Sequence, residues 1–379
     1  MKPLINWLET SASSPAYSGW VLLGIAICFF GAGINTMAGW LYVISGVSFA
    51  LLGVAAILPP RSLTHLSITR HPITPVSAGD ELSVELEVSN SGKQSVNLLQ
   101  IADILPFVLG KPTQQAIETI PPQTSHRWQY HHPAPHRGVY RWQTVELATG
   151  APLGLFWCRR QHQAPATAYV YPQVLSLTQC PLIDQMGEED SLRGDPRGKP
   201  LSMATEGLVR SLRPYRLGDP MRLIHWRSSA RYGDLRVREL ELITGGQEVV
   251  IALDTASNWQ PEDFEQAVIA AASMYFYAQK QQLALQLWTA ATGIIKGEYR
   301  VLETLAATNP QEDRTHLPPT SYPIIWLTSN PLTLTSLPAG SRWLLWQYQA
   351  TSSEAIIINQ DLPGKVIQTE ESLQLQLQA

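Results

Sequence analysis

The sequence predicts a membrane protein with three structured parts: a helical hairpin that spans the bilayer, a β-sandwich and an α/β domain. Three observations predict this organisation. No charged side chain occurs between Glu9 and Arg61, and this gap is long enough for two spanning helices of about 20 residues each. Alternating apolar and polar residues dominate residues 73–175. Continuous apolar runs then alternate with helical patterns across residues 247–360.

Charge, turn residues and periodicity divide the 379-residue chain into segments. In order they are an N-terminal segment (1–16), the transmembrane hairpin (17–60), the β-sandwich (73–175), a linker loop (176–205), an arginine-rich segment (206–246), the α/β domain (247–360) and a C-terminal tail (361–379). The linker is expected because glycine, proline and acidic residues crowd together there. Within the tail, residues 370–379 are polar and repetitive, and they receive no assigned structure.

Two membrane-spanning helices are expected over residues 17–34 and 38–58, joined by a tight turn at residues 35–37. Trp20 and Trp40 would mark the membrane–water interfaces, where indole rings concentrate. A cleaved signal peptide is the alternative. It would need a small-residue cleavage site and no second span after it.

The charges that flank the hairpin predict its orientation. Both ends of a hairpin lie on one side of the membrane, and Lys2, Arg61 and Arg70 flank these ends, whereas the connection is uncharged. Positive residues concentrate on the cytoplasmic side of membrane proteins. We therefore expect a multi-pass protein of the cell membrane with the bulk of the chain in the cytoplasm.

Composition narrows the function classes. The net charge of -4 and the isoelectric point near 6.1 disfavour a nucleic-acid partner, because nucleic-acid-binding domains are usually strongly basic. Cys28, Cys158 and Cys180 are too few and too scattered for a disulfide framework or a zinc site. The sequence also lacks a P-loop, a G-x-G-x-x-G turn and a G-x-S-x-G elbow.

The expected β-sandwich begins with a clear strand. Residues 81–88 read ELSVELEV, so leucine and valine share one face of a strand while serine and glutamate share the other. Turn residues follow at Asn90 and Gly92. Further strand-like runs cover residues 96–101, 128–130, 139–147 and 168–171. Their spacing suits an immunoglobulin-like sandwich with a structural or spacer role.

The arginine-rich segment concentrates charge and turn chemistry. Residues 206–241 contain eight arginines, no lysine and five carboxylates. Arginine used to the exclusion of lysine indicates planar, bidentate or stacked contacts. The alternative is that the nearby carboxylates pair with these arginines in a purely structural network.

A helix is expected from Pro220 to about Arg231. Asp219 can cap its exposed amides, and proline suits the first helical position. Gly233 would end the helix, and the alternation across residues 235–238 predicts a half-buried strand. Helix and strand together would present a ribbon of guanidinium groups.

This segment supplies the candidate binding residues. They are Arg213, Tyr215, Arg222, His225, Trp226, Arg227, Arg231 and Arg238. The expected ligand is an acidic protein partner, and anionic lipid headgroups are an alternative. A further alternative is an enzyme for an anionic substrate, with His225 and Asp219 as acid and base and the arginines as a clamp. No nucleophile motif accompanies the pair, which favours a binding protein over an enzyme.

The C-terminal region alternates strands and helices. Residues 249–253 form a continuous apolar run that ends in Asp254, as expected of a strand buried on both faces of a parallel sheet. Helices are expected from Pro261 and over residues 301–307, and further strands over residues 283–288, 324–327, 344–346 and 355–358. The pattern predicts a doubly wound sheet with ligand sites at the carboxyl ends of its strands, where Asp254 would lie.

Short motifs give the sequence a family resemblance. The arginine-rich segment contains Arg213-Pro214-Tyr215, Gly218-Asp219, Ile224-His225-Trp226-Arg227 and Ser229-Ala230-Arg231, and the β region contains Arg137-Gly138-Val139-Tyr140 and Gly154-Leu155-Phe156. With these motifs the chain resembles the membrane-anchored family catalogued as domain of unknown function 58. The paired helices, β domain and α/β domain extend the resemblance over nearly the whole chain.

The resemblance implies an α/β part similar to a von Willebrand factor A domain. Members of that fold often bind magnesium through an Asp-x-Ser-x-Ser motif, whose oxygens suit a hard cation. Here the residues read Asp254-Thr255-Ala256-Ser257-Asn258. Ala256 offers no side-chain oxygen. Residues 327–330, at a later strand end, lack the aspartate that is expected there. We therefore expect no cofactor, with Asp254 and Ser257 as the residues that would hold magnesium.

The resemblance also implies a partner. The family tends to be encoded beside MoxR-type AAA+ ATPases, so the chain is expected to be a membrane-tethered adaptor that works with such an ATPase. This expectation rests on the family resemblance and not on a motif that contacts a partner.

Overall fold

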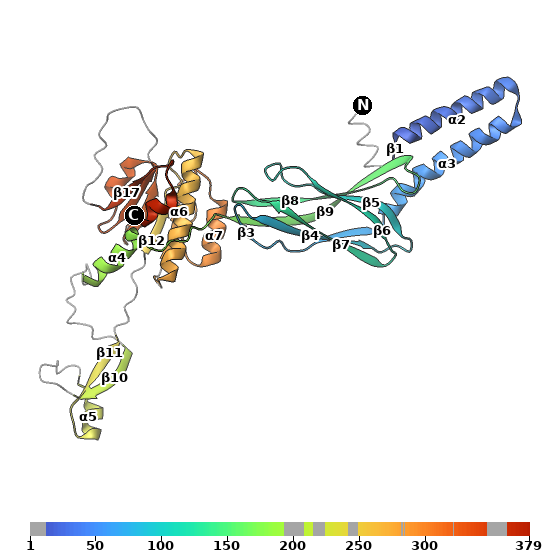
Figure 1. Ribbon diagram of the computed structural model, residues 1–379. Coiled ribbons are helices and arrows are strands. Elements are labelled where there is room, and N and C mark those ends of the chain that lie inside the picture. Colours follow the sequence, from blue (N-terminus) through green and yellow to red (C-terminus); the bar gives the residue numbers. More distant parts are fainter. Residues whose placement is uncertain are drawn as a thin grey trace, which may run out of the picture. The chain divides into compact units, whose positions relative to one another are not determined.

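The structure is a computed structural model, shown in Figure 1. It describes residues 13–192, 208–214, 224–241, 249–281, 283, 285–320, 322–346 and 362–379. The chain forms two compact units, Met1–Tyr171 and Pro172–Ala379. The first unit contains the hairpin and the β-sandwich, and the second contains the α/β domain.

The N-terminal hairpin consists of α2 (Tyr17–Thr36) and α3 (Gly39–Leu63). Met37 adopts a left-handed conformation with φ 51°, so the turn is shorter than the expected residues 35–37. The Thr36 hydroxyl donates to the Ala32 carbonyl within α2. Helix α3 does not end before its two prolines but continues to Leu63, because Leu63 is buried in the core of the sandwich.

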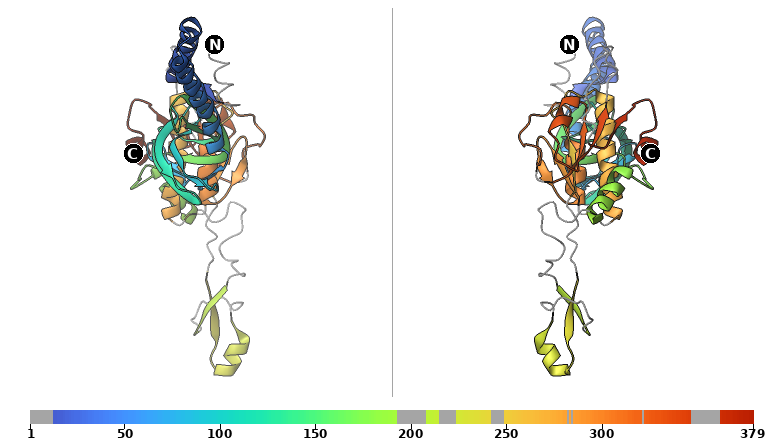
Figure 2. Two further views of the ribbon diagram at one scale, coloured as in Figure 1. Left: turned by 90° about the vertical axis from the view of Figure 1, so that its right-hand side faces the viewer. Right: turned by 90° about the vertical axis from the view of Figure 1, so that its left-hand side faces the viewer.

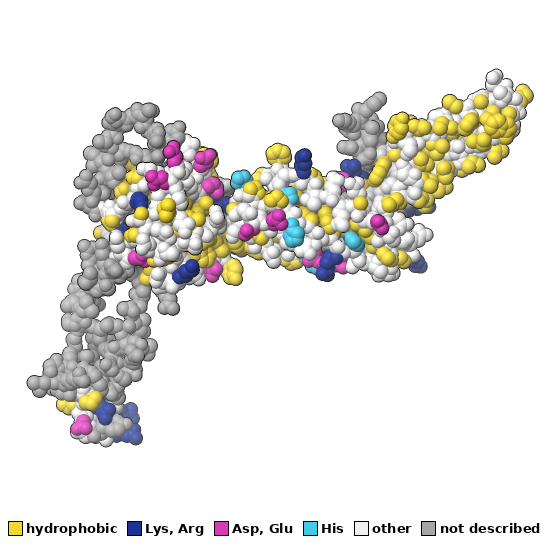
Figure 3. Space-filling view, viewed as in Figure 1, with side chains coloured by type: hydrophobic (Ala, Val, Ile, Leu, Met, Phe, Trp, Pro, Cys, Tyr) yellow, Lys and Arg dark blue, Asp and Glu magenta, His cyan; other side chains and the backbone are white. Residues whose placement is uncertain are grey.

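The hairpin surface is apolar. Both helices are long and apolar enough to cross a membrane, with mean hydropathies of 1.8 and 2.3, and only 17% and 22% of their most apolar windows are buried. Apolar side chains cover its visible face in Figure 3. The helices contact each other through the Ser45 hydroxyl, which donates to the Ala26 carbonyl, and through the Phe30 and Tyr42 rings. These buried fractions are lower than those of a core helix in a globular domain.

The β-sandwich consists of two sheets. One has the order β2-β4-β7 and contains β2 (Leu66–Arg70), β4 (Glu81–Asn90) and β7 (Thr124–Pro133). The other has the order β1-β9-β8-β5-β6 and contains β1 (Ser14–Pro15), β9 (Phe156–Tyr171), β8 (Gly138–Thr149), β5 (Val96–Asp103) and β6 (Thr113–Ile120), with β3 (Val76–Ser77) beside β9. The sandwich thus includes β1 and β2, which lie before the expected first residue 73.

The sandwich core follows the predicted alternation. Leu82, Val84, Leu86 and Val88 of β4 are all buried, as their shared face requires. They pack against apolar residues of the second sheet in one hydrophobic cluster. The sequence pattern therefore identified the correct inner face of this strand.

A polar network crosses the sandwich interior at Asp103. The guanidinium of Arg70 donates to both carboxylate oxygens, and the two side chains are 2% and 0% exposed. The Tyr130 hydroxyl donates to Asp103 over 2.6 Å, and the Trp142 indole N–H donates over 3.1 Å. Burial of both charges is compensated by this pairing. The network therefore links strands of both sheets.

The second unit is built on a mixed sheet with the order β14-β13-β12-β15-β16-β17. Its strands are β12 (Val249–Leu253), β13 (Leu285–Thr289), β14 (Gly293–Ile295), β15 (Ile324–Thr328), β16 (Arg342–Trp346) and β17 (Gly364–Ile367). All neighbouring strands are parallel except β13 and β14. Because β13 and β15 flank β12 on opposite sides, the carboxyl ends of β12 and β15 form a topological switch point.

Four helices contribute to the core on one face of this sheet. They are α4 (Pro181–Leu192), α6 (Pro261–Lys280), α7 (Glu298–Ala307) and α8 (Leu373–Gln378). The opposite face carries a second cluster that includes Trp288, Trp326 and Leu334 of the 3-10 helix η3 (Pro331–Ser336). The predicted alternation of strands and helices is therefore present.

The expected linker loop over residues 176–205 is wrong in its first half, because α4 is a helix of the α/β unit. Ile183 and Met186 are buried in the core of that unit. The Asp184 carboxylate accepts from the Cys180 backbone N–H over 3.0 Å and from the Tyr277 hydroxyl over 2.7 Å. The polar residues that crowd the sequence after this face made the helix difficult to predict. The remainder, residues 193–205, lies outside the described part of the chain.

The C-terminal tail over residues 361–379, to which no elements are assigned from the sequence, contains regular structure. Residues 364–379 contain β17 and α8, and the expected strand at residues 355–358 lies outside the described residues. Leu373 and Leu377 are buried because they recur at i and i+4 on one face of α8. The alternating Leu-Gln sequence hid this helical spacing.

Candidate functional site

The arginine-rich module, defined as residues 208–214 and 224–241, is a small β-hairpin that carries one helix. Strand β10 (Leu208–Pro214) pairs with β11 (Arg236–Glu241) in antiparallel register. Helix α5 (Trp226–Tyr232) precedes β11. The strands and the helix appear as one module in the two side views of Figure 2. Ile224 pairs with Val237, and both side chains are only 2% exposed.

The expected helix start at Pro220 is wrong, because Ile224 pairs as extended backbone and a helix cannot run through it. Helix α5 instead begins at Trp226, with His225 as its N-cap. The His225 Nδ1 accepts from the Ser228 backbone N–H over 3.2 Å and lies 2.8 Å from the Ser228 hydroxyl. Asp219 and Pro220 lie outside the described residues.

The expected helix end is correct. Gly233 adopts a left-handed conformation with φ 79°, and its N–H donates to the Ser229 carbonyl. The expected helical face of Arg222, His225 and Ser229 does not form, because His225 precedes the first helical residue. Arg222 lies outside the described residues, as does Tyr215.

The described candidate residues of α5 are exposed. Trp226 is 62% exposed, and Arg227 and Arg231 are also exposed. Among the described residues neither of these arginines forms an ion pair. Arg213 on β10 and Arg238 on β11 lie at neighbouring register positions of the hairpin. The described arginines of α5 are therefore exposed side chains.

The candidate catalytic pair is not assembled by the described residues. The Nδ1 of His225 is occupied by Ser228, and no hydrogen bond joins its ring to a described carboxylate. The described part of the chain also contains no group of three or more His, Cys, Asp or Glu that could hold a metal ion.

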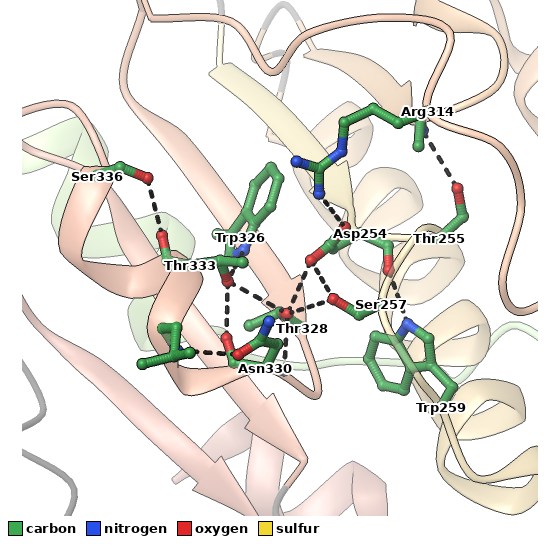
Figure 4. A network of polar contacts seen from close by, with 12 residues as sticks. Asp254, Thr255, Ser257, Trp259, Arg314, Trp326, Thr328, Asn330, Thr333 and Ser336 are labelled. Atoms are coloured by element: carbon green, nitrogen blue, oxygen red, sulfur yellow. Dashed lines mark hydrogen bonds and ion pairs between the residues drawn. The ribbon is translucent and has the colours of Figure 1, made fainter.

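A second polar cluster lies at the switch point of the α/β sheet. Asp254 directly follows β12 and is fully buried. Its Oδ2 accepts from the hydroxyls of Ser257 and Thr328, and its Oδ1 lies 3.5 Å from an Arg314 guanidinium nitrogen. Figure 4 shows these three side chains converging on Asp254. The carboxylate therefore has partners on both oxygens.

Thr328 connects this carboxylate to the turn after β15. Its hydroxyl oxygen accepts from the Asn330 backbone N–H over 3.0 Å and lies 3.4 Å from the Thr333 hydroxyl. The Thr333 hydroxyl accepts from the Trp326 indole N–H over 3.0 Å. Sequence reasoning identified Asp254 and Ser257 but missed Thr328. The position of Thr328 at the end of a buried strand is the sequence feature that could have identified it.

The residues around Asp254 do not fit a magnesium ion. Magnesium is usually held by one or two carboxylates together with several waters, and here the single carboxylate accepts hydrogen bonds from two hydroxyls. Ala256 contributes no side-chain oxygen. The Arg314 guanidinium also places a positive charge beside the carboxylate. The cluster is therefore a hydrogen-bonded carboxylate paired with a cationic side chain.

Comparison with known proteins supports part of the family resemblance. Residues 211–319 match the family model "Protein of unknown function DUF58". The uncharacterized protein YeaD of Bacillus subtilis (strain 168) is 24% identical over 259 residues, which are 67% of this chain and 62% of the relative. The match to the family model includes α5, Asp254, Ser257 and Arg314, whereas Thr328 lies beyond its end. The alignment spans less than two thirds of the relative's length.

Solved structures overlap only part of the chain. The CARDB domain of the PF1109 protein from Pyrococcus furiosus is 11% identical, with a TM-score of 0.19, and the overlap covers 26% of this chain and 91% of that chain. A putative late embryogenesis abundant protein, At2g46140.1, is 14% identical, with a TM-score of 0.21, and the overlap covers 33% of this chain and 83% of that chain.

Proposed function

We propose that this chain is a membrane-tethered interaction protein. The hairpin anchors the chain in the bilayer, and the arginine-rich module docks an acidic partner protein on the cytoplasmic side. One observation carries the proposal: Trp226, Arg227 and Arg231 are exposed on one short helix, and the two arginines have no ion pair among the described residues.

The hairpin supports the anchoring role. Its helices expose most of their apolar surface, and large exposed apolar surfaces mark contact with a membrane or a partner. The exposed Arg61 at the end of α3 favours a cytoplasmic location for both hairpin ends. Arg70 adds little to this orientation signal, because its charge is buried against Asp103.

The chemistry of α5 supports an acidic protein partner. Guanidinium groups bind carboxylates in bidentate geometry, and tryptophan and arginine are enriched among the residues that dominate binding interfaces. The family resemblance adds a candidate for the partner, a MoxR-type AAA+ ATPase. We propose that such an ATPase binds the module through acidic side chains.

The α/β domain supports the same role. We propose that it is similar to a von Willebrand factor A domain, on the basis of its mainly parallel sheet and of Asp254 at the switch point. Because the cluster around Asp254 does not fit magnesium, the proposed docking does not depend on a metal at this position. The enzyme alternative receives no support from the described residues, since His225 contacts Ser228 and not a carboxylate.

Co-purification from native membranes tests the docking role. The full-length chain is compared with an Arg227→Ala/Arg231→Ala variant and with an Arg300→Ala control, which removes an exposed arginine of α7. We expect the double variant to lose its specific partner and the control to retain it. Lysine replacements at residues 227 and 231 should not restore binding if the contacts are bidentate. Retention of every specific partner by the double variant would contradict the docking surface.

A further inference from the structure

The hairpin and the sandwich are joined without a flexible linker. Only Thr64 and His65 separate the end of α3 from the start of β2, and the Ser91 backbone N–H and hydroxyl both donate to the His65 carbonyl. Leu63, in the last turn of α3, is buried in the sandwich core. The position of α3 therefore fixes the position of this end of the sandwich.

The connection between β8 and β9 lies directly against the start of α2. The Ala16 backbone N–H donates to the Leu155 carbonyl over 2.8 Å, and the Ser18 hydroxyl donates to the Gly154 carbonyl over 2.9 Å. A Cβ atom at Gly19 would lie 2.3 Å from the Leu155 carbonyl oxygen. Residues 151–155 therefore lie at the level of the first turn of α2.

This hairpin-side end of the sandwich exposes three large apolar side chains. Leu98 is 64% exposed, Leu153 is 45% exposed and Trp157 is 42% exposed. They belong to one region, because the Thr149 hydroxyl donates to the Leu98 carbonyl and a Cβ atom at Gly150 would lie 3.5 Å from the Trp157 ring. Three separate segments thus direct apolar groups outward at the same end.

Leu98 has a second unusual property. Its φ of 50° is left-handed, a conformation that non-glycine residues adopt at a free-energy cost. It interrupts the regular pairing of β5 with β6, in which Asn97 faces Thr119 and Leu99 faces Ile117. In water this backbone conformation leaves 64% of an apolar residue exposed. Contact with an apolar environment would offset that cost.

The length of α2 places this end at the membrane surface. Its 20 residues measure about 30 Å at about 1.5 Å per residue, roughly the thickness of the hydrocarbon layer. Because α2 has no length to spare, its first turn must lie at the boundary of that layer. Tyr17 and Trp20 are 86% and 60% exposed there, and aromatic side chains concentrate at this depth.

We propose that Leu98, Leu153 and Trp157 lie in the headgroup layer of the bilayer that the hairpin spans. The hairpin-side end of the sandwich is then a peripheral membrane contact in addition to the two spanning helices. This proposal rests on the membrane anchoring proposed above. The occupant is the lipid surface because Trp157 pairs with Ser14, just before α2, and the Gly154 carbonyl, next to Leu153, accepts from Ser18 at the start of α2.

The opposite end of the sandwich provides a matched control. Phe107 is 97% exposed and lies in the connection between β5 and β6, next to the pair of Asp103 with Thr113. The other end of β5, where Leu99 pairs with Thr149, is the hairpin-side end. Phe107 is apolar and more exposed than Leu153. Depth in the bilayer, and not exposure of an apolar residue, will therefore distinguish the two positions.

Fluorescence quenching by lipids tests the proposal. Cys28 is exposed on α2, while Cys158 and Cys180 are buried, so the native chain has one accessible thiol, near the middle of a span. Leu153→Cys and Phe107→Cys are made in a Cys28→Ser background. Each full-length protein is labelled in detergent with a thiol-reactive fluorophore and reconstituted into vesicles. The vesicles contain phosphatidylcholine with a nitroxide either on the headgroup or on the acyl chain.

We expect the label at residue 153 to be quenched by the headgroup nitroxide, the label at residue 107 to be unquenched, and the label on Cys28 to be quenched by the acyl-chain nitroxide. Equal quenching at residues 153 and 107, with Cys28 still quenched, would overturn the headgroup contact and leave the anchoring intact. An unquenched Cys28 would overturn the anchoring and the contact together.

Discussion

At the residue scale, the Asp103 carboxylate is the clearest example of a charge that the interior accepts only because its partners are complete. Its contacts with Arg70, Tyr130 and Trp142 join residues that are 27 to 39 positions apart in the chain. No local pattern marks them in the sequence. The alternation of apolar residues identified the inner face of β4 but gave no sign that a buried ion pair would join the two sheets.

Replacing Asp103 with Asn will destabilise the sandwich. The substitution leaves the Arg70 guanidinium buried without its counter-charge, and breaking a buried pair in this way costs about 3–5 kcal/mol. Thermal unfolding of the protein in detergent measures the effect. Asp80→Asn, at an exposed position beside the start of β4, is the control and should cost about 0.5 kcal/mol or less. Equal losses in both variants would contradict the structural role of the pair.

Cys180 makes the stability of the second unit depend on pH. Burial raises the pKa of its thiol to about 11, whereas an unfolded cysteine titrates near about 8.5. The folded state therefore holds the proton more tightly. This contribution to stability is complete below about pH 8.5 and is lost as the pH rises toward 11.

Unfolding measured as a function of pH tests this dependence. The wild-type protein should lose stability more steeply between about pH 8.5 and 11 than a Cys180→Ala variant. The comparison is made between slopes, because the variant also removes packing atoms and has a different absolute stability. Identical slopes would mean that the thiol titrates at the same pH in both states.

The Asp254 cluster shows what sequence reasoning can and cannot locate at this scale. An aspartate after a continuous apolar run is visible in the sequence, because strand ends of a parallel sheet carry such groups. Its partners Arg314 and Thr328 are 60 and 74 residues away. Only the order of the strands brings them together, and that order was not available from periodicity.

At the element scale, helices with strong tertiary contacts were the most difficult to predict. Helix α4 was expected to be a loop, and the residues of α8 received no assigned structure. Each contributes two or three apolar side chains to a core formed mainly by other elements, so its own periodicity is weak. Long runs such as α6 and β12 were predicted correctly because their burial pattern is visible within one segment.

The start of α5 was predicted incorrectly for a related reason. Asp219-Pro220 is a good local helix-start signal, but the pairing of Ile224 with Val237 holds the backbone extended. The tertiary contact determines where the helix begins, whereas the local signal at Gly233 correctly predicted where it ends.

Asp184→Ala will weaken the docking of α4 on the α/β unit. The carboxylate lies in the first turn of α4 and accepts from the Cys180 N–H and from the Tyr277 hydroxyl, and loss of a helix-capping interaction costs about 0.5–2 kcal/mol. Hydrogen exchange should show faster exchange across residues 181–186 in this variant. Glu303→Ala, at an exposed position of α7, serves as the control and should leave that exchange unchanged.

At the scale of the whole molecule, the division into an apolar hairpin, a sandwich and an α/β unit was predictable because each part has its own periodicity. The charge-free stretch, the period of two and the alternation of strands with helices are all features of the sequence. Binding partners leave no comparable periodic pattern in the sequence. The docking role that we propose therefore depends on which arginines the structure leaves exposed.

Val47→Arg will test the hairpin as a membrane anchor. Val47 is 62% exposed in α3, and an arginine near the centre of a spanning helix costs about 2.5–3.5 kcal/mol for insertion. We expect a smaller share of the full-length protein to remain in the membrane after alkaline extraction. Val47→Leu should match the wild type. Full retention of the arginine variant would indicate that this face of α3 does not contact lipid.

The short junction between α3 and β2 has a mechanical consequence. A spanning hairpin inclines further as the surrounding bilayer becomes thinner. With only two residues between helix and strand, and with Leu63 fixed in the adjoining core, the sandwich cannot stay upright while the hairpin leans. Lipid thickness would thus be converted into an angular displacement of the whole N-terminal unit.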